Sequence, residues 1–110
     1  MKYRIHPEAE QEAEEAAEWY GAREPQLAIE FARQFSLMID DIYENPRRYA
    51  IAEDSPIEVD CRNVLHLGRF PYRIIYALVD DEIFIVAVAH HSRRPRYWHD
   101  RLNDPNSEAS

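Results

Sequence analysis

The sequence has few of the residues that several common kinds of site require. It contains two glycines and neither a GxGxxG nor a Walker A pattern, which argues against a glycine-cradled nucleotide site. Its single cysteine, Cys61, excludes an internal disulfide and fits a reducing compartment. No apolar run approaches the roughly 20 residues of a membrane span, and residues 1–10 hold no apolar signal core. We therefore expect a cytoplasmic protein that does not enter a membrane.

Acidic residues are abundant, but they are unevenly distributed along the chain. The net charge is −8 overall, with −9 in residues 1–60, +3 in residues 61–102 and −2 in the remaining tail. A negative protein is ordinarily a poor partner for nucleic acid. The basic segment is nevertheless large enough to form a local positive surface on an acidic domain.

Residues 1–46 predict a strand and two helices. Residues 2–6 alternate in polarity as a short strand does. Pro7 suits the first position of a helix, and Gly21 suits its C-cap. A second helix begins at Pro25 and ends before Pro46. The two apolar stripes have helical spacing: Ala9, Ala13, Ala16, Ala17 and Tyr20 in the first helix, and Ala28, Phe31, Ala32, Phe35, Met38, Ile39 and Ile42 in the second.

The second half predicts a three-stranded meander. Residues 46–60 have no sustained period and indicate a loop. Strands are expected at residues 62–67, 72–78 and 83–89. Asp80-Asp81 forms a tight hairpin, and the nearly all-apolar run IFIVAVA indicates a central strand. Pro95 starts a short C-terminal helix, PRYWHDRL, and the polar residues 103–110 are expected to be disordered.

The predicted fold class is therefore α+β. The elements follow the order β-α-α-β-β-β plus a short C-terminal helix, within one domain of residues 1–102. The helical hairpin must bury its stripes, so we expect it to pack on one face of a small antiparallel sheet in two layers.

Candidate chemistry is concentrated on Arg73 and in the segment 89–101. Neighbouring antiparallel strands bring Arg73 level with His90 or His91, and a turn at Pro95 folds Tyr97 back over the same edge. Guanidinium, imidazole and phenol groups would then surround one concavity. Such a set suits a phosphodiester, because arginine forks onto phosphate oxygens, histidine titrates near neutrality and tyrosine stacks on bases.

Each of these residues also has an ordinary structural interpretation. Arg73 can point to solvent from an outer sheet face. His90 and His91 are adjacent in extended chain, so at most one of them joins the site. The basic run 93–96 can be a solvated surface, and Trp98 can anchor the C-terminal helix.

Two further alternatives concern metal binding and the first helix. A zinc site is conceivable from Cys61, His90, His91 and His99. The chain, however, has no CxxC or HxxxH spacing, and we expect no metal and no cofactor. The glutamates of the first helix are expected to form a solvated face.

The combination of motifs resembles the RelE/ParE toxins of bacterial type II toxin–antitoxin systems. The resemblance spans residues 2–101 and rests on a helical hairpin followed by VLHLGRFPYRIIYALVDDEIFIVAVAHHSRRPRYW. Within that stretch are the YRIIY strand, an acidic hairpin, an apolar strand that ends in AxAH, and R-x-P-x-Y-W. The resemblance implies a growth inhibitor that is neutralised by a cognate antitoxin in a hetero-oligomer.

In the RelE-like branch, the resemblance implies cleavage of mRNA in the ribosomal A site. The implied catalytic residues are Arg73, His91, Arg93 and Tyr97. Arg73 and Arg93 would stabilise the charged transition state, His91 would act as general acid or base, and Tyr97 would orient the nucleotide. Target-binding residues would be Arg62, Arg69, His90, Arg94 and Arg96.

In the ParE-like branch, the same scaffold poisons DNA gyrase by binding. RelE-like nucleases usually carry lysines near the start of the meander, whereas this chain reads EDSPIEVDC there. An acidic loop repels an RNA backbone but is a smaller obstacle for a protein target. The sequence leaves both targets open, as well as a non-toxic binding module on the same scaffold.

Overall fold

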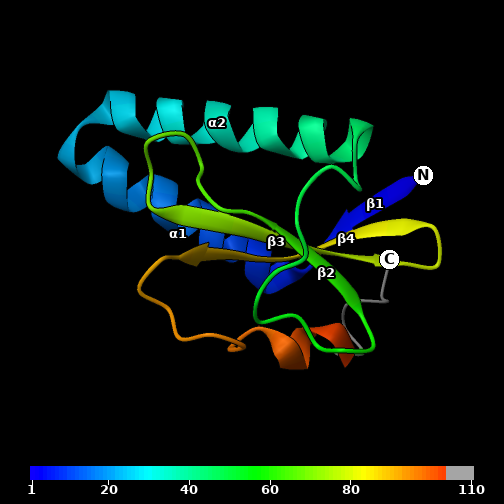
Figure 1. The fold of residues 1–110 in the computed structure, drawn as a ribbon. Coiled ribbons are helices and arrows are strands. Elements are labelled where there is room, and N and C mark those ends of the chain that lie inside the picture. The colour runs from blue at the N-terminus through cyan, green and yellow to red at the C-terminus, as the bar shows by residue number, and fades with distance from the viewer. Residues whose placement is uncertain (104–110) are drawn as a thin grey trace.

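The computed structural model, in which residues 1–103 are described, has the element order that the sequence predicts (Figure 1). In chain order the elements are β1 Lys2–Ile5, α1 Pro7–Arg23, α2 Pro25–Glu44, β2 Asp60–Val64, β3 Tyr72–Val79, β4 Glu82–His90 and the 3-10 helix η1 His99–Asn103. The α+β fold class and the helical hairpin are confirmed.

Helix α1 begins as predicted, but its C-cap is Glu24, three residues after the predicted Gly21. Pro7 occupies the first turn, and the buried His6 caps the helix by accepting a hydrogen bond from the Glu8 N–H at 3.0 Å. Gly21 is not the C-cap, because α1 continues to Arg23. A Cβ atom on Gly21 would lie 2.9 Å from Cβ of Ala28 on α2, so this glycine allows the two helices to approach closely.

We expect Gly21→Ala to destabilise the protein. Alanine should gain about 1 kcal/mol from helix propensity, but an overpacked contact costs about 1–3 kcal/mol. A net loss of about 1 kcal/mol in the free energy of unfolding is expected from urea titrations. Ala28→Gly in the same chain should relieve the contact and recover part of the loss. A Gly21→Ala variant more stable than the wild type would refute this packing role.

The four-stranded sheet has the order β1-β4-β3-β2. Strands β2, β3 and β4 form the antiparallel meander, and Asp80 and Asp81 make its tight turn with φ values of 50° and 60°. Strand β1 pairs parallel to β4, with Lys2 opposite Glu82. The sheet is therefore mixed, and the prediction of a wholly antiparallel sheet was wrong for β1.

Strand β2 is displaced from its predicted position. It spans Asp60–Val64 rather than residues 62–67. Part of the predicted loop pairs with its outer edge: the Ala52 N–H donates to the Cys61 carbonyl at 2.9 Å, and the Asn63 N–H donates to the Ala50 carbonyl at 3.2 Å. This pairing fixes β2 at its start and folds the acidic loop along the sheet.

Both faces of the sheet are covered. The helices bury one face, where the core contains Phe31, Ile42, Ile74, Tyr76, Ile83 and Ile85. On the opposite face the C-terminal segment packs on Cys61, Ile75, Phe84 and Val86, with Trp98 fully buried. Figure 1 shows α2 and η1 on opposite sides of the sheet. The two-layer prediction therefore omitted a third, smaller layer, although Trp98 is the anchor that the sequence indicated.

A bulge in β4 changes which residues face each side. Ile75 pairs with Ala87 and Tyr76 with Ile85, so Val86 is the extra residue. Phe84, Val86 and Ala87 all belong to the core opposite the helices. After the bulge, the residues of β4 that face the helices and those that face the opposite core exchange places. The bulge therefore sets which way the side chains point at the end of β4.

The C-terminal helix is shorter than predicted. The sequence placed it at residues 95–102, but η1 spans His99–Asn103. Arg96 has a φ of +67°, which a right-handed helix does not accommodate. Asn103, predicted as the start of a disordered tail, ends η1, and residues 104–110 of that tail lie outside the described residues. Among the described helices none is long and apolar enough to cross a membrane; the cytoplasmic location stays a prediction.

Candidate functional site

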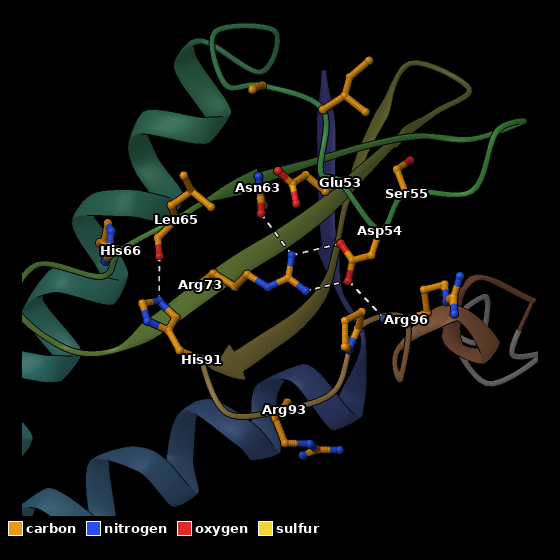
Figure 2. Close-up of a pocket in the computed structure, with 13 residues that line it drawn as sticks. Glu53, Asp54, Ser55, Asn63, Leu65, His66, Arg73, His91, Arg93 and Arg96 are labelled. Atoms are coloured by element: carbon orange, nitrogen blue, oxygen red, sulfur yellow. Dashed lines mark hydrogen bonds and ion pairs between the residues drawn. The ribbon is translucent and has the colours of Figure 1, made fainter.

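A cavity of about 890 Å³ lies where β4 ends and the acidic loop crosses the sheet. Arg73, His91, Arg93 and Arg96 line it together, from β3 and from the segment after β4. Glu53, Asp54 and Asn63 line it from the loop and β2 (Figure 2). Three of the four residues with predicted catalytic roles therefore share this cavity.

Arg73 is held by an ion pair inside this cavity. Its Nη1 and Nη2 atoms donate to Oδ1 and Oδ2 of Asp54 at 3.0 and 2.6 Å, and Nη1 also donates to Oδ1 of Asn63 at 3.0 Å. The side chains of Arg73 and Asp54 are 18% and 8% exposed. Arg73 therefore does not point freely into solvent, and its forked donors are occupied by a carboxylate.

Asp54 receives further hydrogen bonds from the C-terminal segment. Its Oδ2 accepts from the Arg96 N–H at 3.1 Å and from the Trp98 indole N–H at 3.0 Å. Burial alone would raise the pKa of Asp54, but the bonds from Arg73, Arg96 and Trp98 hold it well below its ordinary value. The carboxylate is thus ionised at neutral pH and joins the loop, the sheet and the C-terminal segment.

The two adjacent histidines diverge, as the sequence indicated. His91 lines the cavity, and its Nε2–H donates to the Leu65 carbonyl at 2.8 Å (Figure 2). His90 lies in a separate hollow beside α1, where its ring meets Tyr72 edge-on at 5.1 Å. Only His91 is placed with Arg73.

Tyr97 is not brought to the Arg73 cavity. Its hydroxyl donates to Oε2 of Glu12 at 2.8 Å, and the guanidinium of Arg93 lies 3.8 Å from its ring centroid. Burial raises the pKa of the Tyr97 hydroxyl, and the bond to Glu12 raises it further. The expected concavity with guanidinium, imidazole and phenol together is therefore not formed, because Arg96 turns the chain the other way.

Glu12 is the residue that sequence reasoning missed. Besides Tyr97, its carboxylate accepts from both terminal nitrogens of Arg101 at 2.9 and 3.0 Å and from the Val88 N–H at 2.9 Å. Arg101 also donates to the Val86 carbonyl at 3.1 Å. Glu12 and Arg101 therefore bond to main-chain groups of β4 at Val88 and Val86, beyond the residues of β4 that pair with β1. The expectation of a wholly solvated glutamate face on α1 was wrong for Glu12.

The remaining basic candidates are divided between internal contacts and exposed positions. Arg62 donates to Asp60 at 2.8 Å and to the Arg47 carbonyl at 2.7 Å, so it secures the loop. Arg69 pairs with Glu30 on α2 at 2.8 Å. Arg94 and Arg96 are exposed. The role of all these basic residues in binding a target stays a prediction.

Comparison with known proteins places the chain in a family. The family model described as the ParE toxin of the type II toxin–antitoxin system, parDE, matches residues 3–95. The chain belongs to the ParE toxin family. No curated protein that was compared with it matches.

Membership of the ParE family makes this chain the toxin of a type II toxin–antitoxin system and implies a cognate antitoxin as its partner. The match ends at Pro95 and so covers Arg73, His91 and Arg93 but stops before Tyr97. The predicted RelE/ParE relationship and its fold are confirmed.

The residues of the zinc alternative lie in different environments of this ParE-family chain. Cys61 is fully buried in the core opposite the helices, and burial raises the pKa of its thiol to about 11. His90 lies beside α1, whereas His91 and His99 bond to main-chain carbonyls of Leu65 and Asp54. Within residues 1–103, the structure has no cluster of three or more His, Cys, Asp or Glu side chains suited to a metal.

Proposed function

We propose that this toxin inhibits growth by binding DNA gyrase rather than by cutting RNA. The observation that carries the proposal is that the donors of Arg73 on β3 are already engaged by a carboxylate of the same chain. Both terminal nitrogens of Arg73 donate to the carboxylate of Asp54, at 3.0 and 2.6 Å. A nuclease needs such donors aimed at the charge that develops on the scissile phosphate.

The other groups of the implied nuclease set are also engaged or divided. The hydroxyl of Tyr97 donates to Glu12, outside the cavity that contains Arg73 and His91. The acidic loop crosses this cavity with Glu53 and Asp54 on its lining. RNA would have to approach a chain of net charge −8 past these two carboxylates. A protein target that is only bound requires neither an assembled catalytic set nor the passage of a phosphate backbone past these carboxylates.

Expression in cells distinguishes the two mechanisms. Induced wild type is expected to arrest growth and to change the supercoiling of a reporter plasmid, while full-length messages persist. His91→Ala should behave like the wild type, because a gyrase binder does not need that imidazole for proton transfer. Messages cut within codons by the wild type, and left intact by His91→Ala, would instead favour the mRNA-cleaving RelE-like mechanism.

The antitoxin is proposed to dock across the helical hairpin. Trp19 on α1 and Ile29 and Leu37 on α2 are 52%, 67% and 52% exposed. They lie in the part of the chain, residues 1–60, that has a net charge of −9. Charge complementarity therefore favours an antitoxin helix with an apolar stripe flanked by basic residues.

Leu37→Glu should weaken neutralisation without unfolding the toxin. The exposed leucine is lost from the proposed interface, and a further negative charge is added opposite a basic partner. We expect the dissociation constant for the antitoxin to rise at least tenfold, as measured by isothermal titration calorimetry. Ser36→Glu adds the same charge beside Leu37 without removing an apolar side chain. Unchanged affinity for both variants would place the antitoxin elsewhere.

A further inference from the structure

A second hollow, of about 440 Å³, lies where α1 runs beside the end of β4 (Figure 1). It is separate from the Arg73 cavity, although Arg93 lines both. Four aromatic rings from α1, β3 and β4 line it: Trp19, Tyr20, Tyr72 and His90. This aromatic hollow is suited to a group that packs on ring faces.

The four rings meet edge to face in a row. The ring centroids of Trp19 and Tyr20 are 5.0 Å apart, and their planes cross at 86°. Tyr20 and Tyr72 follow at 6.4 Å and 65°, and Tyr72 and His90 at 5.1 Å and 89°. Rings at such angles turn their faces in different directions, so a group in the hollow meets more than one of them. The face of an aromatic ring is negative and attracts cations.

Trp19 already attracts a guanidinium of its own helix. The guanidinium carbon of Arg23 lies 3.3 Å from a ring centroid of Trp19, and its Nη1 donates to the Trp19 carbonyl at 3.1 Å. Arg23 does not line the aromatic hollow, so it leaves the hollow open to another cation.

The α1 side of the aromatic hollow is strongly acidic. Helix α1 contains six glutamates and one basic residue. Two of these glutamates, Glu12 and Glu15, line the hollow. Glu15 is exposed, and its carboxylate accepts from the neutral amide of Gln11 at 3.1 Å. Because Glu15 and Trp19 are four residues apart on α1, their side chains lie on the same face. A cation between them would meet both a carboxylate and a ring.

The positive charge on the lining, Arg93, is already engaged within the chain. Its guanidinium lies 3.8 Å from the ring centroid of Tyr97 and 3.8 Å from Oε2 of Glu12. Glu12 also pairs with Arg101 at 2.9 Å. Glu15 is therefore the carboxylate of the lining that is left for an incoming cation.

We infer that the aromatic hollow binds the guanidinium of an arginine side chain on the antitoxin. A guanidinium is planar, stacks on rings and forks onto a carboxylate, and an ammonium group does not combine these properties. The inference rests on the antitoxin docking proposed above. Trp19 is 52% exposed and belongs to both that surface and the hollow, so a helix on the hairpin would bring a basic side chain within reach.

The hollow can be probed without the antitoxin. N-acetyl-L-arginine methylamide, titrated into ¹⁵N-labelled toxin, should shift the indole N–H signal of Trp19 saturably, with a dissociation constant on the order of 10 mM. The buried indole of Trp98 should not respond. The corresponding citrulline amide has the same shape without the charge and should give no saturable shift. Equal shifts from both amides, or none from either, would overturn the inference.

Variants of the lining separate a specific site from general attraction to an acidic protein. Glu15→Gln should weaken binding of the arginine amide about fivefold, because one carboxylate contact in a wet place is lost. Glu14→Gln removes an exposed charge of the same helix that is not on the lining, and binding should persist. Equal weakening by the two variants would overturn the inference.

A pair of variants at Trp19 tests the ring face itself. Trp19→Leu should abolish saturable binding of the arginine amide, whereas Trp19→Tyr, which keeps a ring, should retain most of it. The amide signal of Ser92, which also lines the hollow, reports binding in both. Wild-type affinity in a folded Trp19→Leu protein would overturn the inference.

Competition with the cognate antitoxin tests whether it is the occupant. At ten times its own dissociation constant, the arginine amide should raise the dissociation constant of the antitoxin about threefold to tenfold, and the citrulline amide should not. An unchanged affinity for the antitoxin would overturn it as the occupant. If Leu37→Glu still weakens the antitoxin in that case, the docking across the hairpin stands and only the arginine inference fails.

Discussion

Replacing Asp54 with alanine is expected to lower the free energy of unfolding by about 3–5 kcal/mol. The side chain of Asp54 is 8% exposed and pairs with Arg73, whose side chain is 18% exposed. Its loss would leave a positive charge on Arg73 without a counter-ion in a largely dehydrated place. It would also remove the acceptor of the Arg96 and Trp98 N–H groups. Urea titrations in phosphate-free buffer measure this change.

Glu53→Ala is the matched control for this prediction. Glu53 is the adjacent acid in the same loop, and its side chain is exposed, so its replacement should change stability by no more than about 0.5 kcal/mol. An Asp54→Ala protein within 1 kcal/mol of the wild type would show that the ion pair contributes little. In that case the loop must be held by its pairing with β2.

The same ion pair predicts how stability depends on pH. The pKa of Asp54 is lowered in the folded state, mainly by Arg73 against the opposing effect of burial. Its contribution is therefore complete above the unfolded pKa of about 4 and is lost as the pH falls below that value. The stability difference between wild type and Asp54→Asn should shrink between pH 6 and pH 3. A difference that stays constant over this range would contradict the assignment.

Replacing Glu12 with alanine should be about as damaging, with an expected loss of about 3–5 kcal/mol. Glu12 is the nearer counter-ion of Arg101, whose side chain is 9% exposed, and it accepts from Tyr97 and from the Val88 N–H. The variant would leave Arg101 with only the exposed Glu8 at 3.8 Å, and it would leave two donors without their acceptor. Urea unfolding measures the loss.

Glu14→Ala on the same helix is the control, because Glu14 is exposed and should cost no more than about 0.5 kcal/mol. A double-mutant cycle of Glu12→Ala with Arg101→Met should give a coupling energy of about 1–3 kcal/mol. A coupling near zero would show that Glu12 belongs to a solvated face after all.

Local patterns were sufficient to predict the elements that depend on local physics. The apolar stripe of α2 has helical spacing, and Phe31 and Ile42 are buried as that spacing requires. Pro7 and Pro25 stand at the starts of their helices. The run IFIVAVA predicted a central strand, and β4 lies between β1 and β3.

Long-range partners were not predictable in the same way. Glu12 and Arg101 are 89 residues apart in the chain, and Asp54 and Trp98 are 44 apart. Nothing in the sequence near Glu12 distinguishes it from the other glutamates of α1. The bulge at Val86 is hidden as well, because an all-apolar strand has no alternation to interrupt.

Part of the geometry that was predicted for the candidate residues is observed, while their roles stay predictions. The two histidines diverge as adjacent residues in a strand should, and His91 shares a cavity with Arg73. Tyr97 was misplaced because the positive φ of Arg96 turns the segment after Pro95 toward Glu12. Asp54 was visible as part of an acidic loop, but its ion pair with Arg73 depends on how that loop crosses the sheet.

The central claim is that the toxin acts by binding DNA gyrase. The most direct test is a supercoiling assay with purified gyrase. Wild-type toxin is expected to inhibit supercoiling and to leave linear plasmid after denaturant and protease treatment, as expected of trapped cleavage complexes. His91→Ala should do the same. Unimpaired supercoiling at a large excess of folded toxin, together with cleavage of mRNA on purified translating ribosomes, would contradict the account.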